Sequence, residues 1–431
     1  MRIESNNSMF SKGQKISLLI EKLLYGGSGL SHVGTMACFI DDVIPGETVL
    51  AEITAVKRQY ATASLAAVAE ASAQRVTPFC DVFGTCGGCQ WQHIDYSGQL
   101  HWKRLIVREC LERIGGIHDA PVLEPLPSPA TVQYRSRTNL KVSSSHTPAI
   151  GYFQRGTHRV IPVAFCPLLA APLNQALAYC SSLCAKNSTQ VQHVDEIQLL
   201  LAGSSNEVLI TFCNETLIKS CLLFTPGPGQ QAVMLEEPSL PPAGLTFHDD
   251  IMGISFSRSP LTFYQVNKEQ NAAMISTVLN YLAPSAAQNI LDLYCGCGNF
   301  SLFLAREGAS IVGIDASSNA ITEAISNAAA NGLHTCVYAC GDVEKTIPRF
   351  LSTRFNSVLI NPPRRGCSPG ILNHISRINP RIIVYVSCNP ATLARDLKLL
   401  IAGGYHIETI QPVDMFPQTY HIETIVKMLK S

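Results

Sequence analysis

The sequence predicts an α/β protein whose C-terminal part is a doubly wound, Rossmann-like parallel sheet. It predicts an OB-like β-barrel at the N-terminus and an α+β domain between the two. In the C-terminal part, short apolar runs alternate with helix-like runs, and most apolar runs end in a polar side chain or a glycine turn, which is typical of open parallel sheets. A length of 431 residues suggests two to four domains. We expect domains over 9–70, 71–255 and 256–431.

The N-terminal segment has the pattern of a small β-barrel. Short runs with alternating polar and apolar residues, such as 16–20 and 48–53, are separated by the turns 25–29 and 45–47, which contain glycine or proline. Several short strands at this spacing favour a barrel. We expect five strands between about residue 12 and residue 69.

The central segment contains an unusual group of cysteines. Cys80, Cys86 and Cys89 form a C-x5-C-x2-C run, and Cys166 farther along the chain is followed by proline. Four thiolates can hold zinc or a 4Fe–4S cluster. A zinc ribbon prefers two C-x2-C pairs and only one is present, whereas Cys-Pro also occurs at the end of bacterial iron–sulfur runs. Free thiols are the third possibility.

Cysteine content also bears on location. The chain has 16 cysteines and lacks the pattern of a secretory signal, which favours a reducing, cytoplasmic compartment. Uninterrupted apolar runs are far shorter than a membrane span, so no membrane partner is expected. A helix-like run over 96–114 is expected to pack on the C-terminal domain.

Charge is balanced overall but uneven along the chain. The net charge is zero, yet 101–160 contains nine Lys or Arg against four acidic residues, and 345–398 contains nine against one. Tyr134, Tyr152 and Phe153 lie among the basic residues of the first stretch. Basic side chains and exposed aromatic rings together suit binding of RNA phosphates and unpaired bases.

A glycine loop in the C-terminal part indicates a nucleoside site. The apolar run 289–293 leads into a turn with Gly296 and Gly298, but the third glycine of a dinucleotide-binding loop is absent. Asp292 is a natural partner for an ammonium group. Asp315, at the end of the next apolar run, can accept hydrogen bonds from ribose hydroxyls. These features suit S-adenosylmethionine, which has a ribose and a cationic amino acid but no phosphate.

Cys388 is the main candidate nucleophile. It follows the apolar run 382–386 and precedes a helix-like run over 391–396 that includes Arg395. A helix N-terminus and a nearby arginine both favour the thiolate. Taken alone, a small buried residue at a strand end is the simpler interpretation.

Five sequence blocks together resemble the bacterial RNA uracil-5-methyltransferases, which form 5-methyluridine. The blocks are 263–267, 291–300, 361–366, 385–396 and 416–423. The resemblance implies a methyl-donor site that contains Gln265, Tyr294, Asn299, Asp315 and Asp342, with Asn361 close to the reacting centre. It also implies that Cys388 is the nucleophile and Glu423 the base, that Cys80, Cys86, Cys89 and Cys166 hold a 4Fe–4S cluster, and that the barrel is an RNA-binding TRAM domain.

The chemistry explains why such residues are needed. Addition of the Cys388 thiolate to carbon 6 of uracil makes carbon 5 nucleophilic toward the methyl group. Glu423 then removes the proton from carbon 5 so that the thiolate can leave. The expected partner is a loop or unfolded segment of 23S ribosomal RNA, because a paired uridine must first be turned out of its helix. The enzyme is expected to act as a monomer.

Three alternatives remain open from the sequence. The first is methylation of a uridine in transfer RNA. The second is methylation of an exocyclic amine, because Asn361-Pro362-Pro363-Arg364 is similar to the Asn-Pro-Pro-aromatic motif of amino-methyltransferases, and many uracil-5-methyltransferases have Asp in place of Asn361. The third is a non-catalytic RNA-binding iron–sulfur protein.

Overall fold

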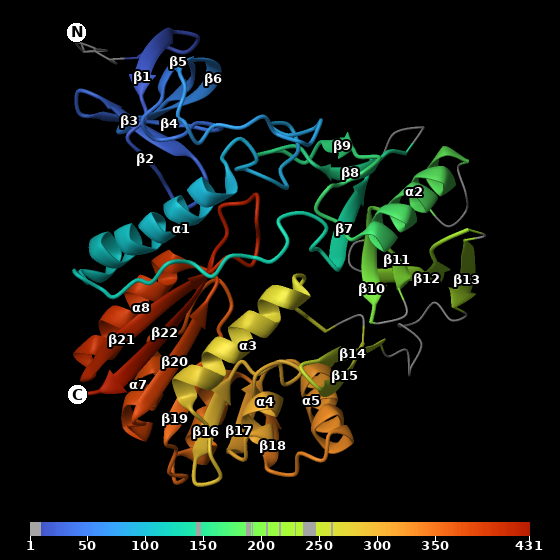
Figure 1. Cartoon of the computed structure of the whole chain (residues 1–431), viewed down its shortest axis with the longest axis vertical. Coiled ribbons are helices and arrows are strands. Elements are labelled where there is room, and N and C mark those ends of the chain that lie inside the picture. Colours follow the sequence, from blue (N-terminus) through green and yellow to red (C-terminus); the bar gives the residue numbers. More distant parts are fainter. Residues whose placement is uncertain are drawn as a thin grey trace, which may run out of the picture.

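A computed structural model describes residues 10–143, 148–186, 191, 193–203, 206–214, 217–228, 230–235, 247–259 and 262–431. These residues form a barrel, a central antiparallel sheet beside it, and a C-terminal sheet flanked by helices (Figure 1). No helix within these ranges combines the length and apolar character needed to span a bilayer.

The N-terminal sheet closes into a barrel because its first strand is bent. Its strands are β1 (Lys15–Leu19), β2 (Lys22–Leu23), β3 (Gly29–Val33), β4 (Met36–Ile40), β5 (Thr48–Val56) and β6 (Tyr60–Glu70), in the order β1-β5-β6-β4-β3-β2. Only Ile20 and Glu21 separate β1 from β2. The Ile20 N–H donates to the Glu47 carbonyl and the Glu21 N–H donates to the Leu30 carbonyl. The expected run 16–20 corresponds to β1, which pairs with β5, and the chain then continues into β2, which pairs with β3.

The central region combines two helices with a seven-stranded sheet. Helix α1 (Tyr96–Cys110) ends in a wider turn over Leu111–Gly115, and α2 (Ala171–Ala185) packs its apolar face on the sheet. The sheet order is β13-β12-β11-β10-β7-β8-β9. Its strands are β7 (Arg137–Val142), β8 (Ile150–Phe153), β9 (Val160–Pro162), β10 (Glu196–Ala202), β11 (Glu207–Asn214), β12 (Leu217–Thr225) and β13 (Gln231–Leu235).

The C-terminal sheet confirms the doubly wound α/β prediction. Its order is β18-β17-β16-β19-β20-β22-β21, and all neighbours are parallel except the pairs that involve β22. The strands are β16 (Asn289–Leu293), β17 (Ser310–Asp315), β18 (Cys336–Cys340), β19 (Ser357–Ile360), β20 (Ile382–Ser387), β21 (Tyr405–Val413) and β22 (Glu423–Lys430). The helices are α3 (Lys268–Leu282), α4 (Ser301–Arg306), α5 (Ser318–Ala330), α6 (Val343–Thr346), α7 (Pro369–Ile378) and α8 (Pro390–Ala402). Apolar strand residues such as Ile383 and Val384 are fully buried because helices cover both faces.

Helix α1 packs on the C-terminal sheet, against α8 and β21 (Figure 1). Lys103 of α1 is fully buried, and its Nζ donates to Asp414 Oδ1 at 2.5 Å and to the Phe416 carbonyl at 3.1 Å. Gln99, one turn earlier, exchanges two hydrogen bonds with Gln418. Because a buried charge is costly without its partner, these contacts fix α1 on the segment that leads to β22.

A hairpin crosses the expected boundary between residues 255 and 256. It consists of β14 (Phe247–Ile251) and β15 (Ile254–Arg258), so the boundary falls inside β15. The N–H groups of Ser255 and Ser257 donate to the side chains of Asn331 and Asn327, respectively, at the C-terminal end of α5. Strand β15 therefore packs on α5 of the C-terminal domain, whereas Phe247 of β14 packs with Leu200 and Ala202 of the central sheet.

Candidate active site

A cavity of about 680 Å³ lies at the carboxyl edge of the C-terminal sheet. Most of the residues predicted to hold the donor or to react line it: Gln265, Tyr294, Asn299, Asp315, Asn361, Cys388 and Glu423. They come from six separate segments of the chain. The fold therefore gathers at one edge what the sequence spreads over about 160 residues, as expected for ligand sites in open α/β sheets.

The glycine loop after β16 has a strained conformation. Tyr294 has φ 63°, a left-handed value that is costly for a residue with a Cβ. The N–H of Tyr294 donates to the Ile314 carbonyl at 2.8 Å. The next turn residue, Gly296, donates its N–H to Asp315 Oδ2 at 3.0 Å. These bonds hold the loop beside the Asp315 carboxylate and turn the Tyr294 side chain to the cavity.

Asp292 does not face this cavity, contrary to the expectation that it binds an ammonium group. Its side chain is fully buried, and its Oδ2 accepts a 2.5 Å hydrogen bond from Ser301 Oγ. Burial raises its pKa to about 7. Position 292 lies within β16, not at its carboxyl end, and this strand is buried on both faces because helices cover the sheet. The Asp292 side chain therefore fixes the start of α4.

Asp342 is also placed differently from the other predicted donor-site residues. It is not among those that line the cavity. Its carboxylate accepts a hydrogen bond from the Lys345 N–H and caps α6. By contrast, Asn299 lies at the cavity wall and exchanges two hydrogen bonds with Asn271 of α3, at 2.8 and 3.0 Å. The structure thus assigns Asp342 a capping contact and leaves its donor-binding role a proposal.

Cys388 lies between β20 and α8, with Asn389 as the N-cap of that helix. Burial, and next the Glu423 carboxylate, raise the pKa of Cys388 to about 11, and Arg364 opposes this shift. The direction is opposite to the lowered pKa expected from the sequence. Arg395, the cation expected nearby, instead pairs with Asp396 and donates to the carbonyls of Arg365 and Cys367.

Arg364 is a functional candidate that the sequence analysis considered only as a replacement for an aromatic ring. The Asn389 Nδ2 and the Thr392 hydroxyl both donate to the Arg364 carbonyl, at 3.1 and 3.2 Å. The first turn of α8 thereby holds Arg364 next to the nucleophile. Its positive charge opposes the rise in the pKa of Cys388 and of Glu423. The sequence did contain a signal for this role: an arginine follows Pro362-Pro363, where amino-methyltransferases have an aromatic residue.

Glu423 is the first residue of β22 and is 6% exposed. Burial raises its pKa to about 8, and Arg364 acts in the opposite direction. A carboxyl group with a pKa near neutrality can both accept and return a proton, which suits a general base. Glu423 is therefore not a solvated strand residue, although it lies in an alternating strand.

His421 is a further cavity residue without an assigned role in the sequence analysis. Its ring lies 4.2 Å from the ring of Tyr420. Burial, followed by the charge of Arg364, lowers the pKa of His421 to about 4. The imidazole is therefore neutral near pH 7 and can donate or accept one hydrogen bond there.

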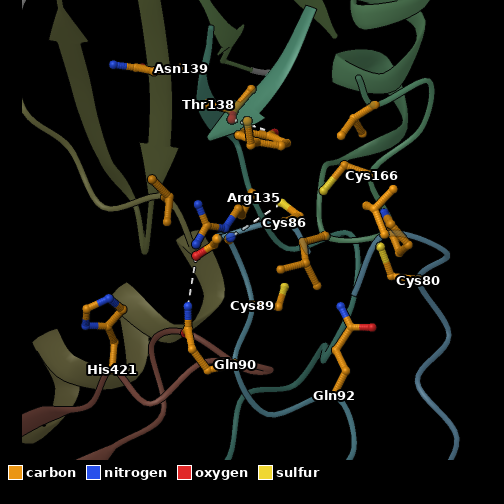
Figure 2. Close-up of a pocket in the computed structure, with 18 of the residues that line it drawn as sticks. Cys80, Cys86, Cys89, Gln90, Gln92, Arg135, Thr138, Asn139, Cys166 and His421 are labelled. Carbon is orange, nitrogen blue, oxygen red and sulfur yellow. Dashed lines mark hydrogen bonds between the residues drawn. The ribbon is translucent and has the colours of Figure 1, made fainter. Parts of the chain in front are cut away.

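A second cavity, of about 850 Å³, adjoins the first and contains the predicted metal ligands. Its lining includes Cys80, Cys86, Cys89 and Cys166, and it shares Arg364 and His421 with the donor cavity. Figure 2 shows the four sulfur-bearing side chains on one side of this cavity and His421 on the other. Burial raises the pKa of Cys89 to about 12, and the neighbouring thiols of Cys166 and Cys86 add to the effect.

The backbone around these cysteines is well supported. Asn174 accepts from the Cys166 N–H and donates back to the Cys166 carbonyl, at 2.9 and 3.0 Å. The Gly88 N–H donates to Cys86 Sγ at 3.4 Å. Among the residues described, however, no group of three or more His, Cys, Asp or Glu is arranged to hold a metal ion. The four thiols line a shared space without converging on one point, so they do not fit a single zinc ion, whose ligands lie about 2.3 Å from the metal.

Comparison with known proteins shows two family matches along the chain. Residues 10–66 match the TRAM domain, and residues 284–401 match a methyltransferase domain. In the solved tRNA (uracil-54, C5)-methyltransferase of Pyrococcus abyssi, bound to S-adenosyl-L-homocysteine, the fold is alike over 96% of this chain and 100% of that one. The TM-score is 0.71 and the identity 23%, so this likeness establishes the fold.

Curated bacterial relatives match over nearly the whole chain. An uncharacterized RNA methyltransferase of Thermosynechococcus vestitus is 32% identical over 98% of this chain and 100% of its own length. One from Halalkalibacterium halodurans is 33% identical over 96% of this chain and 97% of its own length. The chain therefore belongs to the RNA methyltransferase family that these relatives represent, in agreement with the enzyme class that the sequence motifs indicated.

Proposed function

We propose that the protein methylates carbon 5 of a uridine in RNA, with S-adenosylmethionine as the methyl donor and Cys388 as a covalent nucleophile. The observation that carries the proposal is the shared cavity. The side chains of Cys388 and Glu423 line the same space as the glycine loop and Asp315, and Arg364 acts on both reactive groups. A thiol, a carboxyl group and a donor site at one edge match the needs of carbon-5 methylation.

The chain's own residues divide the reaction into two stages. Cys388 releases its proton to solvent water and its sulfur adds to carbon 6 of the ring. The electron pair of the carbon 5–carbon 6 double bond moves onto carbon 5 as an enolate, which can then attack an electrophilic methyl group. S-adenosylmethionine supplies that methyl group on a positively charged sulfur. Glu423 next takes the proton from carbon 5, and the electron pair of that C–H bond restores the ring double bond as the thiolate leaves. Arg364 supports both ionised groups through its charge.

The alternative of amine methylation is less well supported. An Asn-Pro-Pro motif of that class needs an aromatic ring next in sequence to stack on the base, and this chain has Arg364, whose charge opposes the raised pKa of Cys388. An amine reaction also has no use for a buried thiol beside a carboxyl group. Asn361 lines the same cavity, and we propose that it contacts the uracil ring or the donor rather than an exocyclic amine.

We further propose that Cys80, Cys86, Cys89 and Cys166 hold a 4Fe–4S cluster. Such a cluster binds one cysteine at each of four irons, which agrees with thiols that surround a space rather than one point. The bond from the Gly88 N–H to Cys86 Sγ supports the proposal, because N–H donors to cysteine sulfur are a common feature of cluster sites. The RNA target that we propose is 23S ribosomal RNA, with transfer RNA as the alternative.

Replacing Cys388 by Ala should lower 5-methyluridine formation by roughly 10³-fold or more, because the covalent route is lost. Wild-type protein should also form a covalent adduct with RNA that carries 5-fluorouridine at the target, since fluorine cannot leave as a proton. Mass spectrometry should locate the link at Cys388.

Mapping of 5-methyluridine in ribosomal and transfer RNA from a strain without the gene identifies the target. Undiminished methylation by the Ala variant contradicts covalent catalysis.

Replacing Glu423 by Gln should leave the first stage intact and slow release by about 10²–10⁴-fold, the usual contribution of a general base. The variant should therefore accumulate a methylated RNA–protein adduct on ordinary substrate. In the wild type, turnover should rise with pH through about 8, the pKa of Glu423, because only the deprotonated carboxylate accepts the proton. A Glu423→Gln variant with the same turnover as the wild type rules out this role.

Replacing Cys86 by Ser should lower the iron and sulfide content of protein purified without oxygen, together with its visible absorbance. Cys340→Ser is the matched control, because Cys340 is an exposed cysteine outside the cavity and its loss should change neither quantity. Stoichiometric zinc in place of iron, or iron that is unaffected by the Cys86 change, contradicts the cluster.

A further inference from the structure

The barrel reaches the active site through the connection between β2 and β3. This connection, residues 24–28, is a tight turn in which the Gly27 N–H donates to the Leu24 carbonyl and the Leu24 N–H donates to the Ser28 carbonyl, each at 2.9 Å. Trp91 is fully buried and its Nε1 donates to the Gly27 carbonyl at 3.2 Å. The turn is therefore closed by its own backbone hydrogen bonds and attached to Trp91.

The packing at the base of this turn is continuous with the C-terminal core. Leu23 is 2% exposed and Ile44 is fully buried, and both belong to the same apolar cluster as Leu393 of α8. A Cβ on Gly27 would lie 3.2 Å from atoms of Gln90 and Tyr420. Barrel and catalytic sheet thus meet in close contact, and a displacement of the turn would be transmitted to residues next to Cys388.

Tyr25 at the tip of the turn touches the nucleophile segment directly. Its hydroxyl donates to the Cys388 carbonyl at 3.1 Å. Its ring packs edge-on against Tyr420, with ring centres 5.4 Å apart. Burial raises the pKa of Tyr25 above its ordinary value, and the nearby acidic groups of Tyr420, Cys388 and Glu423 act in the same direction. The phenol therefore stays neutral and remains a donor.

The position of this hydrogen bond explains its effect. The ladder between β20 and β22 ends at Ser387, opposite Thr424, and α8 begins only after its cap, Asn389. Cys388 and the cap residue Asn389 are the two residues between β20 and α8. A donor on the Cys388 carbonyl satisfies a part-buried acceptor and restricts rotation of the peptide group next to the Cα that bears the Sγ.

We propose that Tyr25 is a positioning residue through which the RNA-binding barrel fixes the Cys388 peptide and so sets the orientation of the nucleophile. The inference rests on the proposed function of Cys388. It goes beyond that function, because it assigns the barrel a part in the chemical step as well as in RNA binding. RNA bound to the barrel would then stabilise the turn 24–28, whose Tyr25 holds the Cys388 peptide.

Tyr25→Phe tests this role because it keeps the ring contact with Tyr420 and removes only the hydroxyl. The variant should lower the maximal rate of adduct formation on 5-fluorouridine RNA by about 3- to 10-fold, the range of one net hydrogen bond. The RNA concentration at half-maximal rate should change less than about twofold. Tyr60→Phe is the control: Tyr60 lies on the same barrel and packs on Phe39, and this change should leave the maximal rate unaltered.

The outcomes separate this inference from the function on which it rests. A wild-type adduct at Cys388 with an unchanged maximal rate in Tyr25→Phe overturns the positioning role alone. An effect confined to the half-saturating RNA concentration also overturns it, because the hydroxyl then serves only binding. If wild-type protein forms no adduct, the proposed function fails and the inference fails with it. Thermal melting of each variant verifies that all are folded.

Discussion

The site depends on a half-buried thiol and a buried carboxyl group that share one neighbouring guanidinium. Cys388 and Glu423 each have a raised pKa because burial disfavours their charged forms, and the Glu423 carboxylate raises the pKa of the thiol further. Arg364 offsets part of both effects. The two acids therefore cannot easily be ionised together, which fits a reaction in which one group must be a thiolate early and the other a carboxylate late. A cationic methyl donor in the same cavity would favour both ionised forms by the same electrostatics.

The surrounding fold holds these groups through contacts between distant parts of the chain. The Lys103–Asp414 ion pair and the paired amides of Gln99 and Gln418 attach α1 to the segment that precedes Glu423. Asn389 caps α8 and, with Thr392, holds the backbone of Arg364. Helix α1 also lies beside the barrel in Figure 1, with Lys22 of β2 paired to Glu109 of α1. Contacts among the barrel, helix α1 and the C-terminal sheet therefore fix the positions of the segments that carry Cys388 and Glu423.

The sequence predicted the C-terminal sheet well because apolar strands and polar strand ends are local patterns. The position of Cys388 between β20 and α8 followed from the same patterns. The cation that acts on Cys388 did not follow from these patterns. Arg395 is seven residues from Cys388 in sequence, but its guanidinium pairs with Asp396. The cation that acts on the thiol is Arg364, which lies in the loop after β19. Asp292 was misplaced because it lies inside β16, which is buried on both faces, and not at the end of the strand. Tyr25 had no local signal, since its contact with Cys388 spans 363 positions along the chain.

The most direct test of the electrostatic account is the pH dependence of Cys388 alkylation, followed by peptide mass spectrometry. Relative to the wild type, Glu423→Gln should move the midpoint to lower pH because a neighbouring negative charge is lost, and Arg364→Gln should move it to higher pH. Arg395→Gln should leave the midpoint in place. A midpoint that is the same in all four proteins, or one that responds to Arg395 and not to Arg364, would contradict the account.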